Sequence, residues 1–221
     1  PDVSLKYAWL LVLLAVIGVI YGAAVTLRQT DLKRLIAYSS ISHMGFVLLG
    51  IFALSQVSMT GATLQMFSHG LITGLLFALV GLVYEKAHER SIPKLGGLAR
   101  RMPIIVVVFS VAGLASLGLP STSGFAAEFL VFLGSFKSTA VPGIQIYTVI
   151  AILGVVIGAG YILWMLQRVF YGPPKSQYEG TPDADRLERC YIFAMVAVIM
   201  LIGIYPAILT DIIKMGVLPL L

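Results

Sequence analysis

Apolar stretches long enough to cross a lipid bilayer recur along most of this chain. At 1.5 Å per helical residue, about 20 residues cross the hydrocarbon core, and a spanning segment must satisfy its own backbone hydrogen bonds. The stretches lie at about residues 7–27, 35–55, 60–84, 103–136, 146–171 and 190–214. The pattern predicts an all-α fold, a polytopic transmembrane helix bundle with about six spans that forms one domain over residues 1–221.

The composition agrees with a membrane protein and excludes several other classes. Hydrophobic residues make up 59% of the chain and charged residues 11%. The net charge of +5 comes from cations at the ends of apolar stretches, and a nucleic-acid-binding protein would instead show a basic run interleaved with aromatic residues. Cys190 is the single cysteine and there are three histidines, too few for an iron–sulfur centre or a structural zinc site. With no G-x-G-x-x-G or P-loop motif, we expect no cofactor in this chain.

The beginning of the sequence indicates part of a longer protein. It starts at Pro1 without an initiator Met. The first apolar stretch is too long for the hydrophobic region of a signal peptide and is not followed by a convincing cleavage site. We therefore expect the chain to be a piece of a larger subunit.

The stretch 103–136 is too long for one straight helix and too short for two crossings. It has roughly 34 residues, and the halves on either side of Pro120 and Gly124 are each short for a span. Proline removes a backbone donor, and glycine permits dihedral angles outside the helical region. We expect one crossing by a helix broken at Pro120 and Gly124.

The distribution of Lys and Arg supports this single crossing. Of the 15 Lys and Arg residues, all except Lys6, Lys137 and Lys214 then lie on one side of the membrane. Two crossings would move the cations of 168–189 to the opposite side and remove the asymmetry. The positive-inside rule places the loops 28–34, 85–101 and 172–189 in the cytoplasm and both ends of the chain outside.

One acidic residue stands apart from the other acids. Glu128 lies inside the apolar run "GLASLGLPSTSGFAAEFLVFLGSF", whereas the other acids lie near span ends or in loops. An ionised carboxylate in a bilayer costs about 2.5–3.5 kcal/mol on insertion scales, so such a group is paired, hydrated or neutral part of the time. Glu128 is therefore a candidate for proton transfer. The alternative is a carboxylate that caps the second half of the broken helix, where the helix dipole favours negative charge.

Two histidines also lie within spans. His43 and His69 each follow a serine and lie in the second and third spans, whereas His88 lies in a charged loop and is expected at the interface. A lone buried histidine is more often a core residue than a functional one, but two of them with Glu128 favour a proton relay through water. A metal site of these three residues is a weaker hypothesis, because no i,i+3 or i,i+4 ligand spacing supports it.

Several segments, in order, resemble a known family of membrane subunits. They are "QTDLKRLIAYSSISHMGFVLLG", "QMFSHGLITGLLF", "VYEKAHERSIPKLGGL", "GLPSTSGFAAEFLVFLGSF" and "MLQRVFYGPP". Together they resemble the C-terminal part of the antiporter-like membrane subunits of proton-pumping NADH:quinone oxidoreductase, respiratory complex I, and chain M most of all. The resemblance implies a fold of fourteen transmembrane helices in two inverted repeats, each with a broken helix, of which this chain would supply about the last six.

The resemblance also implies roles for the unusual residues. Glu128 matches the titratable position on the family's broken helix, where the related chains usually have Lys and chain M has Glu. His43 and His69 match histidines of the family's polar axis. The implied function is a proton-translocating subunit of NADH:quinone oxidoreductase, in which Glu128 is the loading site and the histidines relay protons.

This function implies an integral, multi-pass protein of the bacterial inner membrane. Its expected partners are other membrane subunits and the lipid bilayer, and not nucleic acid. The redox and nucleotide sites are expected in other chains. Three alternatives stay open. They are a stand-alone or Mrp-type cation/proton antiporter subunit, a membrane subunit of a proton-pumping hydrogenase, and a structural spacer without a titrating interior group.

Cysteine labelling tests the predicted orientation. In a variant that lacks Cys190, a cysteine at Lys94 should be inaccessible to an impermeant thiol reagent added to sealed cells, because the loop 85–101 is cytoplasmic. It should become reactive once the membrane is opened. Reaction of Lys94→Cys from outside sealed cells would refute the orientation.

Overall fold

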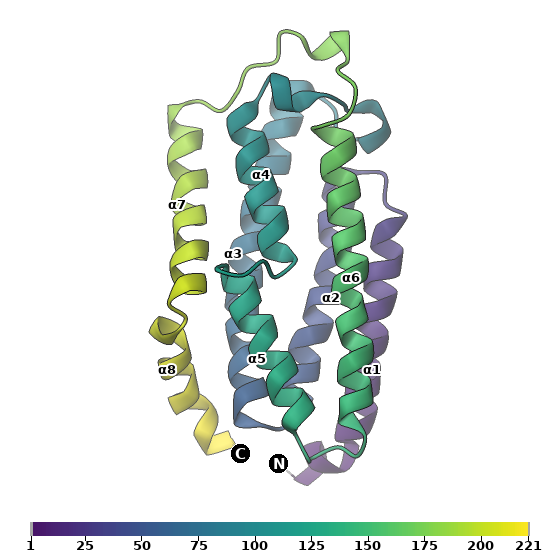
Figure 1. Ribbon diagram of the computed structural model, residues 1–221, viewed down its shortest axis with the longest axis vertical. Helices are drawn as coiled ribbons and strands as arrows, with labels where there is room; N and C mark the ends of the chain where they lie inside the picture. Colours follow the sequence, from purple (N-terminus) through teal and green to yellow (C-terminus); the bar gives the residue numbers. More distant parts are fainter. Residues whose placement is uncertain (1, 221) are drawn as a thin grey trace.

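Long helices that run along a common axis make up the computed structural model, which describes residues 2–220 (Figure 1). The α-helices are α1 (Asp2–Leu27), α2 (Leu32–Phe52), α3 (Gln56–Ala87), α4 (Pro103–Ser116), α5 (Ser123–Lys137), α6 (Ile144–Val169), α7 (Arg186–Ile204) and α8 (Ala207–Val217). Short 3₁₀ turns are η1 (Ile92–Lys94), η2 (Leu98–Arg100), η3 (Ser176–Tyr178) and η4 (Leu218–Leu220). The predicted all-α transmembrane bundle is confirmed.

Within the described residues, five helices are long and apolar enough to cross a membrane. They are α1, α2, α3, α6 and α7. The helices α4 and α5 have 14 and 15 residues, which is short of the roughly 20 that a crossing needs. Figure 1 shows α5 continuing in the direction of α4, so that the pair covers the length of the bundle once. The predicted broken helix is therefore confirmed.

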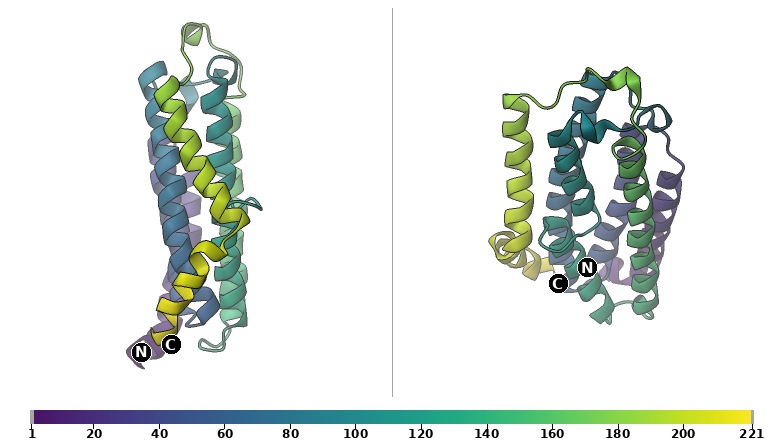
Figure 2. Two further views of the ribbon diagram at one scale, coloured as in Figure 1. Left: turned by 90° about the vertical axis from the view of Figure 1, so that its left-hand side faces the viewer. Right: turned by 45° about the horizontal axis from the view of Figure 1, so that its top comes forward.

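The sixth predicted span, 190–214, is not one continuous helix. It divides into α7, which ends at Ile204, and α8, which begins at Ala207. Pro206 explains the division, because it has no N–H to donate and disfavours helical dihedrals at the residue before it. Tyr205 accordingly has φ −129° and ψ 71°. The side view in Figure 2 shows α8 turning away from the line of α7.

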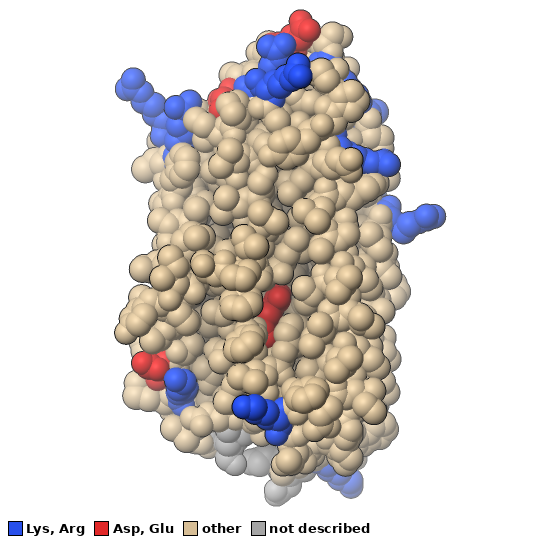
Figure 3. All heavy atoms as spheres, in the orientation of Figure 1, with Lys and Arg blue, Asp and Glu red and all other residues tan. Residues whose placement is uncertain are grey.

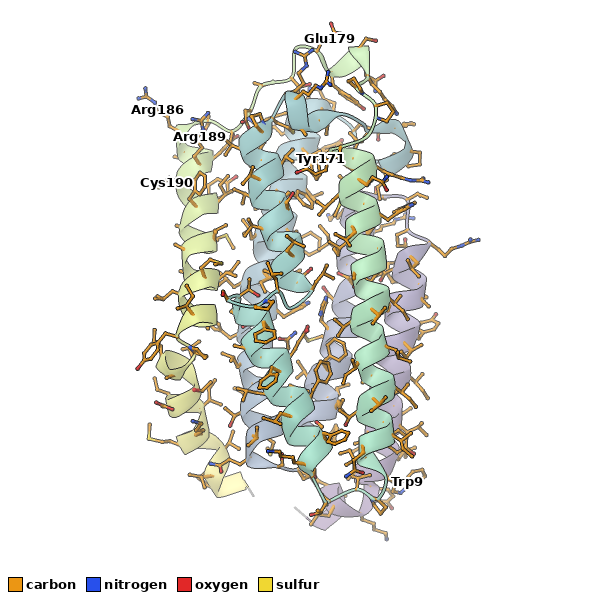
Figure 4. All side chains as sticks on the ribbon, in the orientation of Figure 1. Trp9, Tyr171, Glu179, Arg186, Arg189 and Cys190 are labelled. Atoms are coloured by element: carbon orange, nitrogen blue, oxygen red, sulfur yellow. The ribbon has the colours of Figure 1, made fainter. Side chains whose placement is uncertain are left out.

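Both chain ends lie at one end of the bundle and the three charged loops lie at the other (Figure 1). The space-filling view shows most of the visible Lys and Arg side chains gathered at the loop end (Figure 3). Exposed aromatic residues occur near both ends, with Trp9 close to the chain termini and Tyr171 close to the loops (Figure 4). Such residues are typical of the two membrane–water interfaces.

The loop between α6 and α7 is fastened to the rest of the molecule. Asp183 accepts hydrogen bonds from the backbone N–H groups of Ile104 at 2.9 Å and Ile105 at 3.3 Å, which are free donors at the start of α4. Lys175 Nζ donates to the carbonyl oxygen of Lys94 at 2.8 Å. These contacts fix the half-helix that leads to the break.

Two large apolar clusters and a smaller one, which contains Leu64, Ala127 and Ile202, lie inside the bundle. The largest lies toward the loop end and contains residues of α3, α4 and α6, among them Ile72, Ala115 and Tyr161. The second lies toward the chain termini and contains residues of α1, α2, α5 and α6, among them Phe46 and Val131. Interior polar groups lie where the two large clusters meet, because Tyr161 of the first and Phe46 of the second line one cavity with Glu128.

Helices α3 and α5 approach closely at two glycines. A Cβ atom added to Gly61 of α3 would lie 2.5 Å from the backbone nitrogen of Val131, and one added to Gly134 of α5 would lie 2.2 Å from that of Ser58. Small residues at such positions let membrane helices pack backbone to backbone. The contact brings the face of α5 that carries Glu128 against α3.

Gly134→Ala tests this contact. The added methyl group would meet the backbone N, Cα and Cβ atoms of Ser58, none of which can move without the helix, so α3 and α5 must separate, and we expect a loss of about 1–3 kcal/mol in stability. The thermal midpoint of the purified, assembled protein measures this. Gly81→Ala, also on α3, is the control, because no atom lies within 4 Å of the added Cβ within the chain. Equal midpoints for the two variants would contradict the described packing.

Candidate functional site

A break in the middle of the bundle positions the predicted proton-transfer residue. Helix α4 ends at Ser116 and α5 begins at Ser123. The chain takes positive φ at Gly118, +70°, and at Ser121, +76°, on either side of Pro120. Figure 1 shows this turn about halfway along the bundle, and Figure 3 shows an acidic group at that height.

Gly124 has a different role from the one expected of it. It lies inside α5, and the irregular dihedral angles occur at Gly118 and Ser121. A Cβ atom on Gly124 would lie 2.4 Å from the carbonyl oxygen of Ala115. Gly124 therefore permits the start of α5 to approach the end of α4. Pro120 lies within the break, as predicted.

Glu128 points from α5 into the interior of the bundle. Its residue surface is 5% exposed. One carboxylate oxygen, Oε1, lies 3.4 Å from His43 Nδ1 of α2 and accepts a hydrogen bond of 3.3 Å from Gln65 Nε2 of α3. The other oxygen, Oε2, faces Gly118, where an added Cβ would lie 2.9 Å away. A side chain at Gly118 would therefore collide with the carboxylate as well as strain the turn.

These contacts argue against the capping alternative. Glu128 is the sixth residue of α5, whereas the free N–H groups of a helix belong to its first turn. The cap position, Thr122, makes no side-chain capping hydrogen bond. The carboxylate instead faces α2 and α3, so its environment is that of an interior polar group.

The two predicted histidines lie next to each other, and His43 also lies next to Glu128. The ring centroids of His43 and His69 are 5.6 Å apart. His69 Nε2 lies 3.1 Å from the hydroxyl oxygen of Thr73, one turn along α3. The structure thus brings together all three predicted residues in a line that runs from α5 through α2 to α3. His88 is the C-cap residue of α3, at the loop end of that helix, and has a left-handed backbone conformation with φ 51°.

Two small cavities flank the carboxyl group. Both are lined by His43, Glu128 and Ser116; one is bordered further by Tyr161 of α6, and the other by His69 and Gln65. Each has a volume of about 10 Å³, the order of magnitude that a single water molecule needs. The site therefore has polar lining and room for water on both sides of Glu128.

Sequence reasoning did not single out Gln65 or Tyr161. Gln65 lies four residues before His69, so one helical turn places both side chains on the same face of α3. An amide at that spacing within an apolar run is a signal that predicts a shared site. Tyr161 carries no comparable signal, because buried tyrosines are common in membrane helices and its neighbours in sequence are apolar.

The described residues contain no group of three or more His, Cys, Asp or Glu side chains arranged to hold a metal ion. The site also differs from the charged groups at the loop end. There Lys86 Nζ lies 2.9 Å from Glu188 Oε2, which joins α3 to α7. Hydrogen bonds from the backbone N–H groups of Ser91 and Arg90 lower the pKa of the Glu89 carboxyl, because they stabilise its charged form.

Comparison with known proteins identifies the family. Residues 2–157 match the family model described as "NADH:quinone oxidoreductase/Mrp antiporter, TM". The chain belongs to this family. A relative from Synechococcus elongatus, "NAD(P)H-quinone oxidoreductase chain 4 1", is 44% identical over 96% of this chain and 40% of its own length. "NADH-quinone oxidoreductase subunit M" of Pseudomonas aeruginosa is 42% identical over the same shares.

Solved structures of the family have the same fold. A chain of "Respiratory complex I from Thermus thermophilus with bound NADH" is 31% identical, with a TM-score of 0.88 over 95% of this chain and 43% of that one. A chain of the Mrp complex from Dietzia sp. has a TM-score of 0.86 over 96% of this chain and 47% of that one; at 16% identity, this likeness concerns the fold alone. The chain spans about 40% of the length of the curated relatives. The chain is a multi-pass protein of the bacterial inner membrane. This follows from the family to which it belongs, from its apolar helices and from its bacterial relatives.

Single histidine variants test the line of polar groups. We expect His43→Ala to lower proton transfer about tenfold, because it removes the imidazole that lies 3.4 Å from Glu128 Oε1. His69→Ala should have a smaller effect, because the polar partner of His69 Nε2 is the hydroxyl of Thr73 and water can replace the imidazole in the cavity beside Glu128. The measurement is proton uptake by membranes with equal amounts of assembled complex. Loss of assembly in either variant would favour the alternative of core histidines that only support packing.

Proposed function

We propose that this chain is the proton-transferring part of a membrane subunit of an NADH:quinone oxidoreductase complex. One observation carries the proposal: a carboxyl group is buried at a helix break, in contact with an imidazole and an amide, with a water-sized cavity on each side. The curated relatives at 44% and 42% identity, which are named as quinone oxidoreductase chains, support it. Other membrane subunits of such a complex are the expected partners.

Transfer of a proton between His43 and Glu128 has a low free-energy cost. A carboxylate beside an imidazolium and a carboxylic acid beside a neutral imidazole have the same number of protons and the same net charge. A proton therefore moves from His43 Nδ1 to Glu128 Oε1 without leaving an uncompensated charge in the apolar interior. The distance of 3.4 Å is close to a hydrogen bond and requires only a small approach of the two side chains.

Net transport needs a second step that exchanges a proton with the surroundings of the pair. His69 and the cavity beside it extend the polar line on one side, and the cavity bordered by Ser116 and Tyr161 extends it on the other. Charge changes elsewhere in the complex would favour one state of the pair over the other. Each tenfold change in that preference requires about 1.4 kcal/mol. Electron transfer in partner subunits is the proposed source of this energy, and we propose that this chain itself holds no cofactor.

The second candidate function is a subunit of a cation/proton antiporter. The likeness to the Mrp complex chain favours it only as far as the fold. A carboxylate at a helix break is also suitable for binding a metal cation such as sodium. The sequence identities above favour the quinone oxidoreductase. Dependence of transport on sodium, with no coupling to NADH oxidation, would favour the antiporter.

Glu128→Gln tests the proposed function. Glutamine keeps the size and hydrogen-bonding capacity of the side chain but cannot gain or lose a proton in the relevant range. We expect normal assembly, a fall of at least about 100-fold in proton transfer through this subunit, in line with the loss of an acid–base group, and lower coupled NADH:quinone turnover.

Glu128→Asp is the matched variant. It keeps the titratable group and displaces it by about one methylene, so part of the proton transfer should remain. Proton uptake and NADH:quinone turnover are measured in membranes matched for complex content. Full pumping by Glu128→Gln would contradict the proposal.

A further inference from the structure

Gln65 is a buried amide with only one of its two polar ends paired. The residue is 3% exposed and lies on α3, one turn before His69. Its Nε2 donates to Glu128 Oε1 at 3.3 Å, whereas its Oε1 is buried without a hydrogen-bond partner among the described residues. An unpaired buried carbonyl is costly, and methionine would fill a similar volume without that cost. The amide therefore needs an explanation other than packing.

The chemistry of the carboxyl group supplies one. An ionised carboxylate only accepts hydrogen bonds, whereas a protonated carboxyl group also donates one through its O–H. A neighbour that serves both states must offer a donor and an acceptor from the same place. The primary amide of Gln65 has both, and its terminal torsion is broad and roughly two-fold, so a half-turn exchanges Nε2 for Oε1.

We propose that Gln65 is a positioning residue that holds the Glu128 carboxyl group in place in both of its protonation states. The structure shows Gln65 Nε2 donating to Glu128 Oε1, which is the arrangement that suits an ionised carboxylate. When a proton leaves His43 Nδ1 and forms the O–H bond on Glu128, the amide of Gln65 turns. Its carbonyl oxygen, Gln65 Oε1, then accepts a hydrogen bond from that O–H. Gln65 itself neither gains nor loses a proton. The inference rests on the proposed role of Glu128 as a titrating group.

The other groups around Glu128 are less suited to this role. The titratable residues that line its cavities are His43 from α2, His69 from α3 and Tyr161 from α6. The imidazole of His43 changes charge in the same step and so is no constant partner. From α4, the hydroxyl of Ser116 donates to the carbonyl of Gly113 at 2.7 Å. Gln65 is the neighbour with a permanent donor and a free acceptor.

Gln65→Met tests the inference in the assembled complex. The spectroscopic readout is the infrared difference between high and low pH, in which the C=O band of protonated Glu128 is identified by its absence in Glu128→Gln. Because a hydrogen bond to the O–H weakens the C=O bond, we expect this band to move to higher wavenumber in Gln65→Met. Proton pumping should fall about tenfold, the factor expected for loss of a charge-assisted hydrogen bond. Gln56→Met, at the start of the same helix, should change neither quantity.

The outcomes separate this inference from the proposed function. A band that moves in Gln65→Met and not in Gln56→Met supports the positioning role. A Glu128 band that is present but unchanged in Gln65→Met overturns that role and leaves the titration of Glu128 intact. Absence of any Glu128 band between high and low pH in the unmodified protein overturns both. Normal pumping by Gln65→Met with equal complex content also overturns the positioning role.

Discussion

The cost of placing a carboxyl group inside an apolar bundle governs the architecture around Glu128. The effective penalty for taking an ion out of water is still several kcal/mol after the surroundings relax. The chain meets this penalty with partners from two other helices, His43 of α2 and Gln65 of α3, and with space for water on both sides. These helices must then stay in close register with α5, which is the role of the glycine contacts between α3 and α5.

The helix break follows from the same requirement. The turn between α4 and α5 makes room for the carboxylate at Gly118, where an added Cβ would lie 2.9 Å from Glu128 Oε2. The break frees backbone groups at membrane depth, and these are tolerated only where protein or water covers them. Here the N–H of Gly118 donates to Ala115, and α7 closes over Thr122 at Gly203, where an added Cβ would lie 2.3 Å from a backbone atom. The broken helix and the covering helix therefore form one unit.

The sequence predicts much of the fold because membrane spans are long, apolar and limited by polar loops. The broken helix follows from length and proline, and the common location of Glu128, His43 and His69 follows from the rarity of such groups inside spans. The interruption at Pro206 is also visible in the sequence, but the apolar residues on both sides favoured one continuous span. Gly124 needed three-dimensional information, because its role depends on a close approach to Ala115. The spacing of Gln65 from His69 is visible in the sequence, but its hydrogen bond to Glu128, 63 residues away, is not.

We propose that Glu128 changes its protonation state during turnover of the complex. The most direct measurement is the infrared difference spectrum between resting membranes and membranes oxidising NADH, recorded for the unmodified complex and for Glu128→Gln. From this proposal we expect a protonated-carboxyl band whose intensity changes with turnover and which is missing in Glu128→Gln. A spectrum in which every carboxyl band that responds to turnover persists in Glu128→Gln would contradict it, because Glu128 would then keep one charge state throughout the cycle.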